Sequence, residues 1–174
     1  LHEQEKQRNE YDFLQAQINP HFLNNTLIAV RSLLGMGEME RASRMMGELI
    51  ELLHVPPTPE VQFVPLAEEL HLVRNYISIM NCRTEKEVEF CSAVPQEFLP
   101  LLVPRMILQP LVGNSFFHGF AEKDEGCRIC IRAGMRGKSL YLTVEDNGEG
   151  ILPKRLEEVR SGHYRSSPAH HGIG

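Results

Sequence analysis

Apolar residues recur at spacings of three and four over the first third of the chain, which predicts two amphipathic helices. The first stripe comprises Phe13, Ala16, Pro20, Leu23, Leu27, Val30 and Leu34, and the second comprises Met39, Ala42, Met46, Leu49 and Leu53. Because only the sequence GMG at 35–37 separates them, we expect an antiparallel helical hairpin. Each stripe is too narrow to be buried by one hairpin alone, so we expect a homodimer that closes a four-helix bundle.

The pattern changes after the proline-rich segment VPPTPE at 55–60. A third helix is predicted over about 65–82, with Leu66, Leu70, Val73, Ile77 and Met80 on one face. Beyond it, alternating residues predict a strand at 88–94 and a β-hairpin formed by 127–133 and 139–145. A helix is predicted over 104–120 and a short one over 153–160, followed by a polar loop.

These elements divide the chain into three parts. A helical hairpin over 1–57 is followed by a connecting helix over 58–83 and an α/β domain of the α+β type over 84–174. Since the first residue is Leu and not Met, we expect a piece of a longer protein. A membrane segment is expected upstream, and the α/β domain is expected to be incomplete at its C-terminal end.

Composition narrows the classes of function. The 174 residues carry 18 basic and 23 acidic side chains, a net charge of −5, without a Lys/Arg tract, which argues against nucleic acid as a partner. No apolar run approaches the roughly 20 residues that span a bilayer. The chain is therefore expected to be a cytoplasmic domain.

The four cysteines are Cys82, Cys91, Cys127 and Cys130, and the last two form a CxxC motif. Residues three apart on a strand point to opposite faces, so these two thiols should not share a metal ion. Without a second CxxC, we expect buried free thiols in a reducing compartment.

His21 is the first candidate for chemistry, in the sequence QINPHFLNN at 17–25. With about 100° per residue, His21 and Asn25 lie on the side of the first helix opposite its apolar stripe. A histidine on a helix surface is usually only solvated, but Pro20 costs about 3 kcal/mol inside a helix. The bend expected there would present a neutral, accessible imidazole, which can act as a nucleophile toward phosphorus.

Three further motifs follow in order along the chain. In LVGNSFFHG, Asn114 and His118 are one helical turn apart. DNGEG at 146–150 follows a strand, so Asp146 could accept a hydrogen bond from an exocyclic amine beside the flexible glycines Gly148 and Gly150, although a plain turn is the simpler interpretation. HGIG at 171–174 could expose backbone amides to phosphate.

The combination of these motifs resembles the sensor histidine kinases of the LytS type. QINPHFLNNTL is similar to the histidine box of that family, VPLAEELHLVRNYISI to its connecting segment, and LQPLVGNSFFHGF to its asparagine box. DNGEG and HGIG are similar to its two glycine boxes. The resemblance implies an ATP-binding domain of the GHKL (Bergerat) fold, an α/β sandwich also found in gyrase.

The resemblance also implies roles for individual residues. His21 would accept the phosphoryl group, with Asn25 positioning it or a water molecule. Asn114, with His118 in the same box, would hold Mg²⁺ and the phosphates of ATP. Asp146, with Gly148 and Gly150, would bind adenine, and Gly172 and Gly174 would lie in the lid over the phosphates. The phosphoryl group would then pass to an aspartate of a response regulator.

Two positions depart from the family pattern VENAIKHG. Gly113 stands in place of a glutamate, and Phe117 stands in place of a lysine or another polar residue. A catalytically weak module for dimerisation and signalling is therefore an alternative to an active kinase. Another ATPase of the same superfamily is a third possibility, which the histidine box disfavours.

Overall fold

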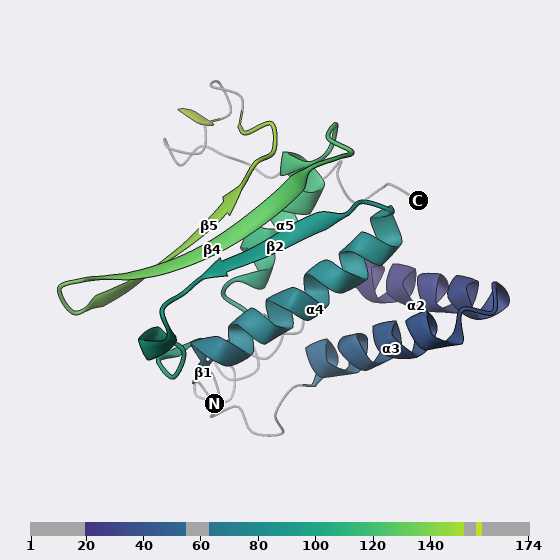
Figure 1. The fold of residues 1–174 in the computed structure, drawn as a ribbon, viewed down its shortest axis with the longest axis horizontal. Helices are drawn as coiled ribbons and strands as arrows, with labels where there is room; N and C mark the ends of the chain where they lie inside the picture. Colours follow the sequence, from purple (N-terminus) through teal and green to yellow (C-terminus); the bar gives the residue numbers. More distant parts are fainter. Residues whose placement is uncertain (1–19, 55–62, 152–155, 158–174) are drawn as a thin grey trace, which may run out of the picture.

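The computed structural model describes residues 20–54, 63–151 and 156–157, and Figure 1 shows their arrangement. Helices α2 (Pro20–Gly35) and α3 (Met39–Leu53) lie side by side and lead to α4 (Leu66–Thr84). The predicted break at 35–37 is confirmed. Gly37 has a φ of 79°, and the Glu38 amide donates to the Leu33 carbonyl at 2.9 Å, which is the bonding pattern of a glycine-terminated helix.

Three strands form a mixed sheet in the order β2-β4-β5. Strand β2 (Val88–Ala93) pairs in parallel with β4 (Cys127–Arg136), which pairs antiparallel with β5 (Ser139–Asp146). The crossover that a parallel pair requires contains η1 (Gln96–Phe98), β3 (Leu102–Pro104), α5 (Gln109–Asn114) and the π-helical turn η2 (Ser115–Gly119). Helices combined with a mixed sheet confirm the α+β class.

The segment before α5 differs from its prediction. The predicted helix over 104–120 is wrong in its first part, because β3 occupies Leu102–Pro104 and α5 begins only at Gln109. Met106 has a φ of 61°, which a right-handed helix excludes. Strand β3 pairs antiparallel with β1 (Phe63–Pro65), and neither of these short strands is evident in the sequence pattern.

The buried faces of the hairpin also differ in part from the predicted stripes. On α2 the buried residues are Phe22, Thr26, Val30 and Leu33, and on α3 they are Ala42, Met45, Leu49 and Leu52. Of the predicted stripe residues, Val30, Ala42 and Leu49 are buried within the chain, whereas Leu27, Leu34 and Met39 are 43%, 46% and 64% exposed in this single chain. The reason is that α2 and α3 pack on α4 of the same chain, which receives a neighbouring face of each helix.

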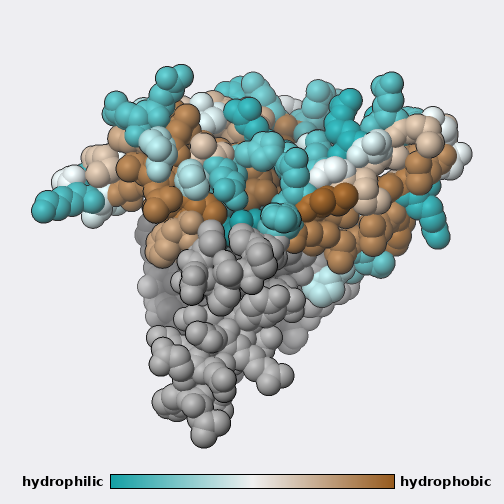
Figure 2. Space-filling view, turned by 90° about the horizontal axis from the view of Figure 1, so that it is seen from below, coloured by the Kyte–Doolittle hydropathy of each residue, from teal (hydrophilic) through white to brown (hydrophobic). Residues whose placement is uncertain are grey.

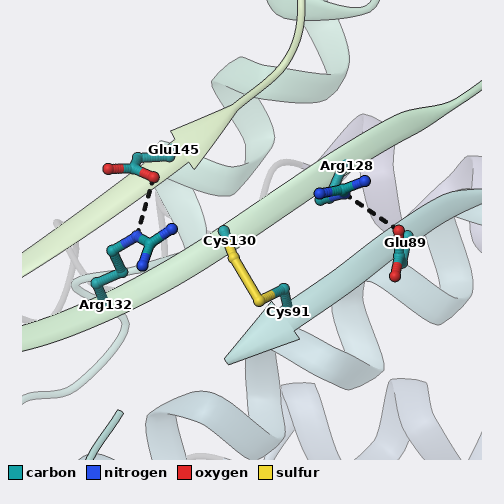
Figure 3. Close-up of a disulfide and its surroundings, with 6 residues drawn as sticks. All are labelled: Glu89, Cys91, Arg128, Cys130, Arg132 and Glu145. Atoms are coloured by element: carbon teal, nitrogen blue, oxygen red, sulfur yellow. Dashed lines mark hydrogen bonds and ion pairs between the residues drawn. A yellow bond between two sulfur atoms is a disulfide. The ribbon is translucent and has the colours of Figure 1, made fainter. Parts of the chain in front are cut away.

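Cys82 lies on α4, and the other three cysteines lie on the two faces of the sheet. Cys127 is buried in the core, whereas Cys130 points to the other face, so the prediction that these two thiols lie on opposite faces is confirmed. The prediction of free thiols is wrong for Cys130, which forms a disulfide with Cys91 across β2 and β4 (Figure 3). Sequence spacing did not indicate this pair because it depends on the register of two parallel strands.

Several predicted segments lie outside the described residues. These are the residues before Pro20, the proline-rich segment 55–60, most of the helix predicted at 153–160 and the loop that follows it. Within the described ranges, no helix is both long enough and apolar enough to cross a membrane.

Candidate functional site

His21 lies in the first turn of the described part of α2, and its side chain is exposed. The Asn25 amide nitrogen lies 3.3 Å from Nδ1 and 3.5 Å from Nε2 of the imidazole. The two predicted partners therefore face each other, one helical turn apart. The bend predicted at Pro20 involves the preceding turn, which lies outside the described residues.

A row of aromatic rings begins at Phe22, the residue after His21. The Phe22 ring stacks on Tyr76 of α4 at 5.2 Å, and Tyr76 meets Phe116 of η2 edge-on at 6.3 Å. Phe116 in turn meets Phe120 at 6.0 Å. Burial raises the pKa of the Tyr76 hydroxyl to about 12, so this tyrosine stays neutral within the row. The row joins the segment that carries His21 to the segment that carries Asn114 and His118.

Asn114 is the last residue of α5, and His118 lies in η2. Both side chains are exposed, while Val112 and Phe116 beside them are buried. Packing of the apolar side of this segment therefore fixes which residues face solvent. Gly113 is buried against α4, and a Cβ there would lie 3.3 Å from the Tyr76 hydroxyl oxygen. Tyr76 therefore leaves little space for a side chain at this position.

Asp146 ends β5, and two donors hold its carboxylate. Ser115 donates its hydroxyl to Oδ2 at 2.8 Å, and the Gly148 amide donates to Oδ1 at 3.0 Å. Each oxygen keeps a lone pair for a further donor, because a carboxylate accepts about four hydrogen bonds. Ser115 is 3% exposed and was not among the residues predicted from the sequence, where its only signal is its position after Asn114.

Gly148 and Gly119 bring the two motifs into direct contact. The Glu149 amide donates to the Gly119 carbonyl at 3.0 Å, and a Cβ on Gly148 would lie 2.6 Å from the Gly119 Cα. A Cβ on Gly119 would lie 3.0 Å from Asp146 Oδ1. Gly148 thus allows the DNGEG loop to cross the end of η2, and Gly150 turns the loop with a φ of 74°.

The loop that leads to α5 is held by the first turn of α4. Buried Glu69, 1% exposed, accepts the Met106 amide at 2.5 Å and the Leu108 amide at 3.4 Å. Burial raises the pKa of the Glu69 carboxyl, although these backbone amides oppose the rise. Arg105 donates to Glu68 at 3.2 Å and to the His54 carbonyl after α3 at 2.5 Å. The hairpin, α4 and the start of α5 therefore meet at one junction.

Known proteins are similar to this chain over most of its length. A sequence profile described as "Histidine kinase" matches residues 9–88. The chain is 34% identical over 150 residues to the sensor histidine kinase YesM of Bacillus subtilis, covering 86% of this chain and 26% of YesM. It is 30% identical to the sensor histidine kinase BtsS of Escherichia coli, covering 93% of this chain and 31% of BtsS. With the sensor protein LytS of Bacillus cereus it shares 33% identity, over 86% of this chain and 26% of LytS.

The chain belongs to the LytS-type sensor histidine kinases. It spans between a quarter and a third of the length of these three relatives. In this chain, the structure brings His21 together with Asn25, and Asp146 together with Gly148 and the end of η2. Gly172 and Gly174 lie outside the described residues.

A separate cleft of about 570 Å³ lies between α3 and α4, away from Asn114 and Asp146. Its lining includes Arg41, Arg44, Glu48, Lys86 and Glu87. Basic and acidic side chains alternate in it, so the cleft has no preference for one sign of charge. The described residues also contain no cluster of three His, Cys, Asp or Glu side chains that could hold a metal ion.

Proposed function

We propose that this chain is the kinase core of a two-component sensor, which binds Mg-ATP, phosphorylates His21 and passes the phosphoryl group to an aspartate of a response regulator. The observation that carries the proposal is the pair formed by His21 and Asn25 on the exposed side of α2, in a chain of this family. The family also supports a response regulator as the partner.

The imidazole of His21 acts as the nucleophile in this proposal. The Asn25 amide nitrogen lies within hydrogen-bond distance of both ring nitrogens, so Asn25 can orient the imidazole. In the neutral ring, the nitrogen that carries no proton has the lone pair that attacks the γ-phosphorus of ATP. The bond between that phosphorus and the leaving oxygen of ADP breaks as the P–N bond forms. Asn25 is thus a positioning residue, and its role depends on the 3.3 Å separation from the ring.

Adenine is assigned to Asp146. Its carboxylate is fixed by Ser115 and the Gly148 amide, and it retains acceptor capacity for the exocyclic amine. Gly148 and Gly150 shape the loop beside it, and Gly172 and Gly174 remain candidates for the lid. This assignment fits the structure because the carboxylate is preorganised, which lowers the cost of ordering it when a ligand binds.

Asn114 is the proposed ligand of Mg²⁺, and His118 one turn away is the second polar group of that surface. The amide oxygen of Asn114 suits a hard cation, and Mg²⁺ usually takes one or two protein ligands together with substrate phosphates. The exposed side chain of Asn114 is accessible to a metal ion that a nucleotide brings with it. The bound ion would neutralise charge on the phosphates during transfer.

The experiment is autophosphorylation of the full-length sensor's kinase region with γ-labelled ATP and Mg²⁺. We expect acid-labile label on wild-type protein, none on His21→Ala, and label at a reduced rate on Asn25→Ala. His54→Ala is the matched control, since this exposed histidine at the end of α3 should leave labelling unchanged. Label that persists in His21→Ala would refute the assignment of the phosphoacceptor.

A catalytically weak signalling module is the second candidate, and Gly113 favours it. The position that carries a glutamate in the family pattern is here packed against Tyr76, and Phe117, 57% exposed, replaces a polar residue. This candidate predicts a stable dimer without measurable ATP binding in isothermal titration calorimetry. Binding in the micromolar range would eliminate it.

The hairpin is proposed as the dimerisation element. Its exposed surface carries Leu27, Ile28, Leu34, Met36, Met39 and Ile50, and Figure 2 shows hydrophobic side chains gathered on the side of the molecule where Figure 1 places α2 and α3. An exposed apolar surface of this kind is typical of protein interfaces. We place this kinase core on the cytoplasmic side of a membrane-anchored bacterial sensor.

A further inference from the structure

We propose that Cys91 and Cys130 form a reversible redox pair, a dithiol that is oxidised by low-molecular-weight or protein disulfides and reduced by thiols. The proposed phosphotransfer uses neither residue, so this inference goes beyond it. Of the two cysteines in the CxxC motif, only Cys130 belongs to this pair, because it bonds to Cys91 rather than to Cys127.

The strand register places the two sulfur-bearing residues side by side. Cys91 of β2 lies opposite Cys130 of β4, with the two Cα atoms 4.5 Å apart. The parallel pairing extends from Val88 to Ala93, on both sides of Cys91. Because this ladder holds the strands whether or not the sulfurs are bonded, the bond can form and break without refolding of the sheet.

Access from solvent distinguishes this pair from Cys127. Cys91 and Cys130 are half-buried on the face of the sheet opposite the core, whereas Cys127 is 2% exposed beneath it. All four charged neighbours of the pair on that face, Glu89, Arg128, Arg132 and Glu145, are exposed (Figure 3). A small thiol or disulfide can therefore approach the sulfurs, while the core thiol is shielded.

Two ion pairs frame the cysteines. Arg128 contacts Glu89 at 3.2 Å, and Arg132 contacts Glu145 at 3.1 Å. Each of these two arginines on β4 is thus matched by a carboxylate on a neighbouring strand. The face is close to neutral around the sulfurs, so it should repel neither anionic nor cationic small disulfides.

The chemistry is thiol–disulfide exchange. The thiolate of one cysteine attacks a disulfide RSSR and forms a mixed disulfide, releasing one thiol RSH. The second cysteine, as its thiolate, then attacks the mixed disulfide and releases the second RSH. Two protein S–H bonds and one external S–S bond are lost, and one protein S–S bond and two RSH are formed, which balances protons and electrons. Excess RSH reverses the reaction.

The test uses the intact chain under native conditions, equilibrated with mixtures of reduced and oxidised glutathione. Free thiols are trapped with N-ethylmaleimide, and the digest is analysed by mass spectrometry. We expect a peptide linked through Cys91 and Cys130 in oxidising mixtures. In reducing mixtures we expect both cysteines alkylated, at least about tenfold faster than Cys127.

Two outcomes would overturn the proposal. One is a pair that stays fully thiol in oxidised glutathione, and the other is a disulfide that survives excess dithiothreitol in the folded protein. Cys91→Ser should abolish the linked peptide, while Cys82→Ser is the matched control that retains it. The readout is peptide mass, so a failure of the kinase proposal would not affect it.

Discussion

Gly148 lies where the loop after β5 crosses the end of η2, and the absence of a side chain permits that crossing. The Gly119 carbonyl accepts the Glu149 amide beside it, so backbone meets backbone at this point. From the sequence motif DNGEG, the glycines are expected to make room for a ligand. The structure shows instead that Gly148 makes room for Gly119, which the motif cannot indicate because Gly119 belongs to a distant segment. The same holds for Ser115, whose contact with Asp146 joins residues 31 positions apart in the sequence.

Gly148→Ala is predicted to displace the DNGEG loop. The added Cβ would lie 2.6 Å from the Gly119 Cα, and overpacking of this kind costs about 1–3 kcal/mol. We expect a lower free energy of unfolding in urea, together with at least about tenfold weaker ATP binding by calorimetry, equivalent to about 1.4 kcal/mol. Gly134→Ala is the control, because a Cβ there meets nothing within 4 Å. Equal stability of both variants would contradict the prediction.

Among the elements, α4 connects the most parts of the structure. Its first turn holds the loop before α5 through Glu69, and further along Asn75 donates to Glu51 of α3 at 2.6 Å. His71 lies 2.7 Å from the same carboxylate, and hydrogen bonds from His71 and Asn75 lower the pKa of Glu51. The apolar periodicity predicts α4 correctly, but it carries no information on which polar side chains reach other elements.

Arg105→Gln is predicted to weaken the junction between the hairpin, α4 and the loop that leads to α5. The guanidinium is only 10% exposed, and it links Glu68 to the His54 carbonyl. Hydrogen bonds to a charged group contribute about 1.5–3 kcal/mol, and we expect a loss of stability of that order in urea unfolding. Arg41→Gln is the control, because solvent screens its exposed pair with Glu38, so its loss should change stability far less. Similar losses in both variants would argue against a special role for the junction.

Glu69→Gln is predicted to change how stability depends on pH. Burial raises the folded-state pKa of Glu69 above the ordinary value of 4.5 for a glutamate, so the folded protein keeps this proton to higher pH than the unfolded chain. The stability that the group contributes is complete below pH 4.5 and is lost as the pH rises through the folded-state pKa. Urea unfolding across this range should show wild type losing stability relative to Glu69→Gln as pH increases, and parallel profiles would contradict the prediction.

At the scale of the whole molecule, local patterns predict the helices of the hairpin, α4, the strand β2 and the hairpin of β4 and β5, because each has a clear period. They do not predict the parallel pairing of β2 with β4. They do not predict β1 and β3, which are three residues each and exist only through pairing with one another. Local patterns also do not show which face of α2 is buried within the chain, because that depends on where α4 packs against it. Local patterns do not predict the disulfide between Cys91 and Cys130 either, because the register of two parallel strands is set by the tertiary structure.

Exposed apolar residues on the hairpin lead to a prediction about assembly. Ile28 of α2 is 48% exposed and Ile50 of α3 is 59% exposed, although α4 already covers the other side of each helix. If a second copy covers them, wild-type protein should sediment at twice the chain mass of 19.8 kDa at micromolar concentration. Ile28→Asp and Ile50→Asp should each shift it to monomer, because burying an unpaired carboxylate costs several kcal/mol.

The control for assembly is Leu102→Asp, since this residue is 65% exposed but lies on β3, outside the hairpin. It should leave the dimer intact, which separates an interface effect from a general effect of added charge. Retained helical circular dichroism in all three variants would show that the subunits still fold. Monomeric wild-type protein, or dimers that persist in both hairpin variants, would exclude the exposed surface of α2 and α3 as the interface. The proposed autophosphorylation of His21 would then have to proceed without a dimer formed through this surface.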